Sequence, residues 1–250
     1  MKKAGMKKGK NKEFSTPYTV TNAAAKGNII TKLSLLIMGL GNIAHKQIGK
    51  GIMFLAVEAA YIWYMIQSGI YNLSMLPSLG WREQEIVWNE KKSIYEYTAG
   101  DQSALILLYG VATVYITAMF IIVWRESVKS SYKSEVLAKS GKHLNNFKED
   151  CKSLLDQNLY KLLLAAPVMG ILIFTILPLI YNITMAFTNY SKVNDHLVLF
   201  DWVGLANFKK ILNFGDSIGK QFYSVLGWTL IWAILATALN YILGMILAII

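Results

Sequence analysis

Four long runs of apolar residues divide the chain, and polar segments separate them. The runs cover about 51–70, 103–124, 162–187 and 225–250. A helix needs roughly 20 apolar residues to cross about 30 Å of hydrocarbon. Backbone groups in lipid must be satisfied within the spanning segment, and the runs lack the alternation of apolar and polar residues that a barrel would show. We therefore predict an all-α integral membrane protein with about four transmembrane helices.

A shorter apolar stretch, residues 29–44, is interrupted by glycines at 39 and 41. At this length an interfacial or re-entrant segment is expected rather than a span. The pattern predicts the following division of the chain: a basic cytoplasmic tail with an interfacial segment (1–50), a transmembrane hairpin (51–124) around an extracellular loop (71–102), a cytoplasmic amphipathic connector (125–161), and two further spans (162–250) around an extracellular loop (188–224).

The charge distribution predicts which side of the membrane each loop occupies. The chain is 54% hydrophobic, with a mean hydropathy of +0.38 and a net charge of +10. Residues 1–50 carry ten Lys and one acid, and 125–161 carry eight basic residues and five acids, whereas acids exceed bases in 71–102. By the positive-inside rule, the N-terminus and 125–161 are cytoplasmic, and 71–102 and 188–224 are outside. The basic excess therefore indicates topology and anionic lipid rather than a nucleic-acid surface.

The sequence contains no arrangement typical of an enzyme or a metal site. Its three histidines, His45, His143 and His196, lie in different segments between the spans, and Cys151 is the one cysteine. No P-loop, HExxH or GxSxG motif occurs. We expect no catalytic residue, no metal and no cofactor bound by this chain.

Glu58 is the one ionisable residue within the predicted spans. A carboxylate at the bilayer centre costs about 2.5–3.5 kcal/mol on insertion scales. It could be a proton or substrate group, or it could be a structural residue that faces another helix or pairs with a Lys near the surface. We favour the structural interpretation.

The last span has a face of small and polar residues that recur every three or four positions: Ala233, Thr237, Asn240, Gly244 and Ala248. Small residues at this spacing let helix backbones approach closely. We predict helix packing through Ala233, Gly244 and Ala248. Asn240 and Thr237, together with Asn182 near the outer end of the third span, are candidates for lining a substrate path, although packing remains the simpler interpretation.

Three phrases carry a family resemblance. FTNYS begins at Phe187, FDWVGLANFKKIL begins at Phe200, and GWTLIWAIL opens at Gly227. Together they resemble the permease subunits of binding-protein-dependent sugar ABC importers, most of all the maltose/maltodextrin-type first permease. The phrases MGLGNIAHKQIGKGIMFL and FKEDCKSLLD are similar to the Gram-positive branch, so the resemblance covers about residues 33–250.

The resemblance implies a multi-pass permease of the bacterial cytoplasmic membrane that moves an oligosaccharide by ATP-driven alternating access. The implied partners are a second permease subunit, a cytoplasmic ATPase dimer that uses ATP and Mg, an extracellular sugar-binding (lipo)protein and the lipid bilayer, with no nucleic acid. The family motif would be a structural element on the outer surface, carried by Trp202, Gly204, Leu205, Asn207 and Phe208.

Two features depart from the family. The cytoplasmic loop with a Glu-Ala-Ala-type motif, which docks in the ATPase, is absent, because the sequence stops at Ile250 within an apolar run. We therefore expect a C-terminally truncated, incomplete permease core. The large extracellular domain of enterobacterial relatives is also absent from 188–224. A non-transporting polytopic scaffold or sensor, or an ABC permease for a different solute, remain as alternatives.

Overall fold

The computed structural model of the chain confirms an all-α membrane architecture, and among the residues it describes four helices are long and apolar enough to cross a bilayer. It describes residues 18–83, 85–97, 100–156, 158–190, 192–193, 196–197, 199–213, 215 and 217–249. The four candidate spans are Ile48–Met75, Ser103–Lys139, Leu162–Met185 and Ser217–Ile249. Most of the predicted basic tail, residues 1–17, lies outside the described residues.

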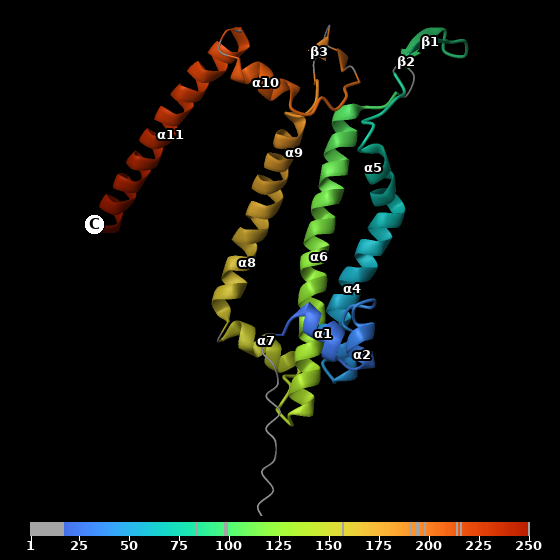
Figure 1. Cartoon of the computed structure of the whole chain (residues 1–250), viewed down its shortest axis with the longest axis vertical. Helices are drawn as coiled ribbons and strands as arrows, with labels where there is room; N and C mark the ends of the chain where they lie inside the picture. Colours follow the sequence, from blue (N-terminus) through green and yellow to red (C-terminus); the bar gives the residue numbers. More distant parts are fainter. Residues whose placement is uncertain are drawn as a thin grey trace, which may run out of the picture. The chain divides into compact units, whose positions relative to one another are not determined.

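The elements follow one another along the chain as Figure 1 shows. The helices are α1 (Val20–Lys26), α2 (Ile29–Leu33), α3 (Leu40–Ala44), α4 (Ile48–Tyr64), the π-helical turn η1 (Met65–Gly69), α5 (Ile70–Met75), α6 (Ser103–Lys139), α7 (Phe147–Leu155), α8 (Leu159–Ile171), the π-helical turn η2 (Leu172–Ile176), α9 (Leu177–Met185), α10 (Ala206–Leu212) and α11 (Ser217–Ile249). Two short antiparallel hairpins join β1 (Ile86–Asn89) to β2 (Ile94–Tyr97) and β3 (Lys192–Val193) to β4 (His196–Leu197). The chain forms two compact units: Met1–Ser74 with Tyr109–Pro178, and Met75–Leu108 with Leu179–Ile250.

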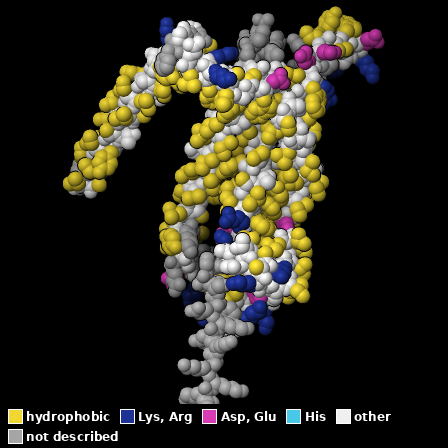
Figure 2. Space-filling model, in the orientation of Figure 1, with side chains coloured by type: hydrophobic (Ala, Val, Ile, Leu, Met, Phe, Trp, Pro, Cys, Tyr) yellow, Lys and Arg dark blue, Asp and Glu magenta, His cyan; other side chains and the backbone are white. Residues whose placement is uncertain are grey.

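In the first unit, the helix α4 packs against α6 through aromatic and hydroxyl side chains. The rings of Tyr61 and Phe120 stack with centroids 3.9 Å apart. The Tyr61 hydroxyl donates to Thr117 Oγ1 at 3.1 Å, and the hydroxyls of Tyr64 and Thr113 are 2.8 Å apart. Because lipid tails are as apolar as Leu, such interhelical packing and hydrogen bonds are what hold helices together in a bilayer. Hydrophobic side chains cover the outer surface of these helices in Figure 2.

The third span contains a π-helical turn immediately before Pro178. A proline inside a helix has no N–H to donate, and its ring clashes with the carbonyl four residues earlier. The wider turn η2 (Leu172–Ile176) lies where that clash would occur. The Leu172 carbonyl accepts a hydrogen bond from the Tyr115 hydroxyl of α6 at 3.1 Å in addition to its own helix bond from Leu177 N–H. This second bond joins the irregular turn to α6.

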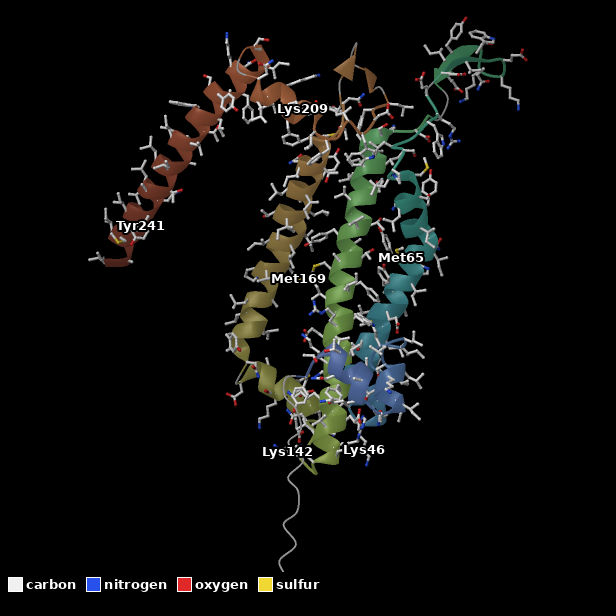
Figure 3. All side chains as sticks on the ribbon, in the orientation of Figure 1. Lys46, Met65, Lys142, Met169, Lys209 and Tyr241 are labelled. Atoms are coloured by element: carbon white, nitrogen blue, oxygen red, sulfur yellow. The ribbon has the colours of Figure 1, made fainter. Side chains whose placement is uncertain are left out.

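The helix α6 is longer than the apolar run that predicted it. The run ends at Trp124-Arg125, but α6 continues to Lys139 over 37 residues, a length of about 55 Å. No Gly or Pro interrupts 125–139. The helix ends at Lys139, and Gly141 follows with a φ of 67°, in the left-handed region. The Gly141 N–H donates to the carbonyl of Ala138, and the N–H of Lys142 (labelled in Figure 3) donates to the carbonyl of Leu137. The predicted connector 125–161 therefore comprises the end of α6, a turn and the separate helix α7.

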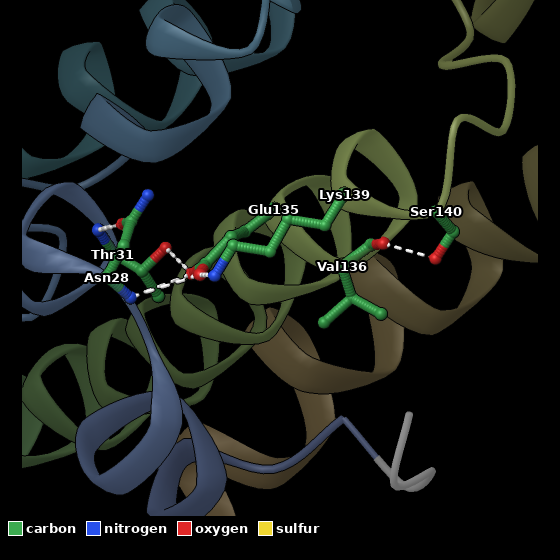
Figure 4. A network of polar contacts seen from close by, with 6 residues as sticks. All are labelled: Asn28, Thr31, Glu135, Val136, Lys139 and Ser140. Carbon is green, nitrogen blue, oxygen red and sulfur yellow. Dashed lines mark hydrogen bonds and ion pairs between the residues drawn. The ribbon is translucent and has the colours of Figure 1, made fainter. Parts of the chain in front are cut away.

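The short segment 29–44 forms α2 and α3, which lie along this end of α6 (Figure 1). The carboxylate of Glu135, 1% exposed, accepts hydrogen bonds from the Asn28 backbone N–H at 3.0 and 3.1 Å and from the Thr31 hydroxyl at 2.6 Å. Lys139, one turn further along α6, forms an ion pair with the same carboxylate (Figure 4). The N-terminal segment is thus held by buried polar contacts, while Ile29 and Leu36 on its other side are exposed.

In the second unit, the β1–β2 hairpin is joined to the spans through Asp101. Its carboxylate accepts hydrogen bonds from the backbone N–H groups of Trp81 (3.1 Å) and Arg82 (3.2 Å). These two bonds, with the charge of the Arg82 side chain, lower the pKa of Asp101 below its ordinary value. The start and the end of the loop between α5 and α6 are connected in this way.

Replacing Glu135 tests the attachment of the N-terminal segment to α6. The substitution Glu135→Ala leaves the Asn28 N–H and the Thr31 hydroxyl without their acceptor, so we expect a loss of roughly 2–4 kcal/mol in the free energy of unfolding. Amide hydrogen exchange should also accelerate at residues 28–34. Unfolding in mixed micelles, followed by circular dichroism, measures the first effect.

The matched control is Glu126→Ala on the same helix. Glu126 forms an exposed ion pair with Lys129, and such pairs contribute about 0–1 kcal/mol. Equal losses for the two variants, with unchanged hydrogen exchange at 28–34, would contradict the structural role of Glu135.

Candidate functional site

The segment Phe200–Phe208, called here the FDWVGLANF segment, lies in the second unit and runs into the first residues of α10. Phe200 is its buried end, with 3% of the residue exposed. The Phe200 ring meets the Tyr190 ring edge-on with centroids 5.4 Å apart, and its backbone N–H donates to the hydroxyl of Ser103 at 3.2 Å. Since Ser103 is the first residue of α6, this end of the segment is attached to the start of the second span.

Backbone pairing connects the middle of the segment to the residues that follow α9. Thr188 and Trp202 form an antiparallel bridge, flanked by a bond from Val203 N–H to Phe187 O at 2.8 Å. The indole Nε1 of Trp202 donates to the backbone carbonyl of Leu76 at 3.0 Å. Leu76 directly follows α5, so Trp202 joins the end of the first span to the end of the third.

Asn207 completes the attachment with two hydrogen bonds from one amide group. Its Nδ2 donates to the carbonyls of Ala186 at 2.9 Å and Thr188 at 2.7 Å. Both carbonyls belong to residues just beyond the end of α9, which ends at Met185. Only a side chain with two N–H groups on one nitrogen can serve both carbonyls in this way. Asn207 therefore caps the backbone that follows the third span, from a position 22 residues after the end of α9.

The remaining residues of the motif shape the turn. Gly204 has a φ of 56°, a backbone conformation that favours glycine. The rings of Phe208 and Phe187 contact each other with centroids 5.1 Å apart. Leu205 is 61% exposed and is the N-cap residue of α10. The FDWVGLANF segment thus connects the ends of α5 and α9 and the start of α6.

The last span, α11, presents its predicted face without a partner among the described residues. From Trp228 to Ile249 every side chain is exposed except Ala236, which is half-buried. The Thr237 hydroxyl donates to Ala233 O one turn earlier at 2.7 Å, so it is satisfied within its own helix. Asn240 is exposed, as is Asn182 on α9. The roles of this face in packing or in a substrate path stay predictions.

Glu58 is half-buried in α4, and its Oε2 accepts a hydrogen bond from the backbone N–H of Met38 at 2.8 Å. Met38 is fully buried between α2 and α3. A carboxylate that holds a neighbouring backbone agrees with the structural interpretation of Glu58. Its role in a proton or substrate path stays untested.

A polar network that the sequence reasoning missed lies in the first unit. Asn42 is fully buried, and its Nδ2 donates to Gln47 Oε1 at 2.9 Å and to Ser130 Oγ at 2.8 Å, while Ser131 Oγ donates to Asn42 Oδ1 at 3.0 Å. The sequence does contain a pattern that indicates this network, because serines at 127, 130, 131 and 134 lie on one face of a helix. Among the residues that the structure describes, no group of three His, Cys, Asp or Glu side chains is placed to hold a metal ion.

Known proteins similar to this chain confirm the resemblance read from the motifs. The chain is 29% identical over 235 residues to the maltodextrin transport system permease protein MdxF of Bacillus subtilis, covering 92% of this chain and 49% of the relative. It is 28% identical over 228 residues to the galactooligosaccharides transport system permease protein GanP of the same species, covering 88% and 49%. It is 29% identical over 219 residues to the maltodextrin transport system permease protein MalC of Streptococcus pneumoniae, covering 86% and 46%.

The chain spans about half the length of the curated relatives it matches. No family model matches it, and no solved structure matches it. With its four apolar helices, the similarity to permeases identifies the chain as a multi-pass protein of the bacterial cell membrane.

Replacing Asn207 tests the cap of the third span. The substitution Asn207→Asp removes both donors and sets a carboxylate against two carbonyls, so we expect the free energy of unfolding to fall by roughly 2–3 kcal/mol. Unfolding in mixed micelles measures this loss. The control is Leu205→Ala in the same motif, where an exposed side chain is shortened and a change within about 0.5 kcal/mol is expected. A loss for Asn207→Asp no larger than that for the control would show that the cap contributes no stability.

Proposed function

We propose that this chain forms the membrane-spanning part of a permease subunit in a binding-protein-dependent ABC importer. The subunit carries an oligosaccharide of the maltose or maltodextrin type into the cell by ATP-driven alternating access. The observation that carries the proposal is similarity along 86–92% of the chain to permease proteins of oligosaccharide transport systems. The FDWVGLANF segment supports it, because its contacts make it a scaffold for span ends rather than a reaction centre.

The proposed partners supply the functions that a single permease subunit lacks. A second permease subunit completes the path, a cytoplasmic ATPase dimer uses ATP and Mg, and an extracellular sugar-binding (lipo)protein delivers the sugar. The exposed face of α11 supports the first of these, since small residues at helical spacing suit contact with another helix. No part of this proposal gives the chain a catalytic role of its own.

The proposed substrate is a maltodextrin because relatives from two bacterial species are named for it. GanP is named for galactooligosaccharides, so the class common to these relatives is an oligosaccharide. Asn182, Thr237 and Asn240 are the proposed polar residues of the path, since oligosaccharide hydroxyls require hydrogen-bond partners when they leave water.

The proposed orientation places the N-terminus and α7 in the cytoplasm, and the FDWVGLANF segment outside. It rests on the excess of basic residues in 1–50 and 125–161. Lys and Arg side chains gather around the end of α6 that carries α2 and α7 in Figure 2.

Cysteine labelling tests this orientation. Leu205→Cys in a Cys151→Ala background should react with a membrane-impermeant maleimide added to intact cells, because position 205 is exposed. The unmodified chain, whose one cysteine is Cys151, should react only after the cells are permeabilised. The reverse pattern would overturn the orientation.

Uptake of labelled maltodextrin in the source bacterium tests the function. Deleting the gene should reduce uptake of labelled maltotetraose at least about tenfold, while uptake of a monosaccharide stays unchanged as the control. Restoring the gene should restore uptake. Loss of uptake for galactooligosaccharides alone would move the substrate to that class. Unchanged uptake of every oligosaccharide, with no ATPase copurifying with the chain, would instead support a scaffold or sensor.

A further inference from the structure

A polar pocket of about 180 Å³ lies in the first unit, where three segments meet. The start of α4 contributes Gln47 and Lys50, the end of α6 contributes Lys133 and Ser134, and the turn before α7 contributes His143 among other residues. Pockets for drug-sized ligands occupy roughly 300–1,000 Å³. The volume here therefore suits a small polar group and is too small for an oligosaccharide.

The charges around this pocket are mostly positive. Lys50 and Lys133 line it, and among the described residues neither ammonium lies within ion-pair distance of a carboxylate. His143 adds an imidazole ring whose Nε2 lies 2.8 Å from Glu149 Oε2. One acid, Asp150, lines the pocket and offsets one lysine. The net charge of the lining is positive whether or not His143 is protonated.

The polar groups below these lysines are fixed by hydrogen bonds. Ser134 and Gln47 are buried, and Ser134 Oγ donates to Gln47 Oε1 at 2.7 Å. Gln47 Nε2 donates to the carbonyl of Asn145 at 3.2 Å, which joins α4 to the turn before α7. The pocket thus has a pre-arranged polar floor rather than loose surface side chains.

Two further features keep the walls of the pocket in place. A Cβ at Gly49 would lie 2.5 Å from Cδ2 of Phe147, so the glycine permits α7 to approach the start of α4 closely. Glu149 accepts a hydrogen bond from the Asn146 N–H at 2.8 Å. That bond, and the bond with His143, lower the pKa of Glu149 below its ordinary value, so its carboxylate stays charged and holds the turn.

We propose that this pocket binds a phosphate group, with Lys50 and Lys133 as the charged ligands. Lysine is a common phosphate ligand that acts as a point charge. The phosphate belongs either to the headgroup of an anionic phospholipid or to free phosphate or a small phosphate ester. Lys50 stands in the first turn of a helix that is long and apolar enough to cross a bilayer, and basic pockets beside such helices favour lipid phosphates. This site is independent of the proposed function, because it needs neither a sugar nor an ATPase.

The test measures binding of a fluorescent phosphatidylglycerol to the full chain in dodecyl maltoside micelles. The variant Lys50→Gln/Lys133→Gln should weaken binding by roughly thirtyfold, since each lysine near an anionic surface contributes about a fivefold preference. The control Lys32→Gln/Lys129→Gln removes two lysines from α2 and α6 that do not line the pocket. It should change affinity by less than about threefold. If the double variant unfolds, the single Lys133→Gln serves, because Lys133 is exposed.

Inorganic phosphate distinguishes the two sources. If millimolar phosphate displaces the fluorescent lipid, and its own binding depends on the same two lysines, the ligand is free phosphate or a small ester. If the lysine-dependent lipid binding resists phosphate, the ligand is a lipid headgroup. Both results support the phosphate site. Equal affinity of the pocket variant and the control variant for both probes, or no binding of either probe by the unmodified chain, would overturn it.

Discussion

The interior of a bilayer offers no water to backbone N–H and C=O groups, and this constraint governs the structure of the chain. Within each span the helix satisfies most of them, but helix ends and irregular turns leave some without partners. At the span ends the protein supplies partners from neighbouring elements: Trp202 reaches the carbonyl of Leu76, and Asn207 reaches two carbonyls beyond α9. Tyr115 adds a second bond to the carbonyl of Leu172 in the π-helical turn. Each of these bonds also fixes one element against another.

The FDWVGLANF segment supplies several of these hydrogen bonds near the ends of the spans. Gly204 adopts a backbone conformation that glycine favours, and Phe200 is buried. The side chains of Trp202 and Asn207 donate hydrogen bonds to carbonyls far away in the sequence. Holding three span ends together through one loop fixes these ends relative to one another.

The apolar runs predicted the four spans because length and hydrophobicity alone decide whether a helix can cross lipid. The end of α6 was not predicted, because the apolar run ends at Trp124-Arg125 and an amphipathic connector was expected after it. The helix instead continues to Lys139, and Asn28, Thr31 and Asn42 bind to its polar side. The sequence predicted the FDWVGLANF motif but not its hydrogen bonds. Nothing near Asn207 in the sequence indicates that its side-chain amide binds the carbonyls of residues 186 and 188.

The most direct test of this account is a disulfide across the FDWVGLANF segment. Thr188 and Trp202 form the bridge flanked by two hydrogen bonds, a pairing that brings Cα atoms to about 4.5 Å, within the range a disulfide needs. In a Cys151→Ala background, Thr188→Cys/Trp202→Cys should oxidise completely within one chain under mild copper-phenanthroline treatment, while Thr188→Cys/Leu205→Cys should stay largely reduced. Equal oxidation of the two pairs, or a reduced first pair, would contradict the claim that this segment joins the ends of the spans.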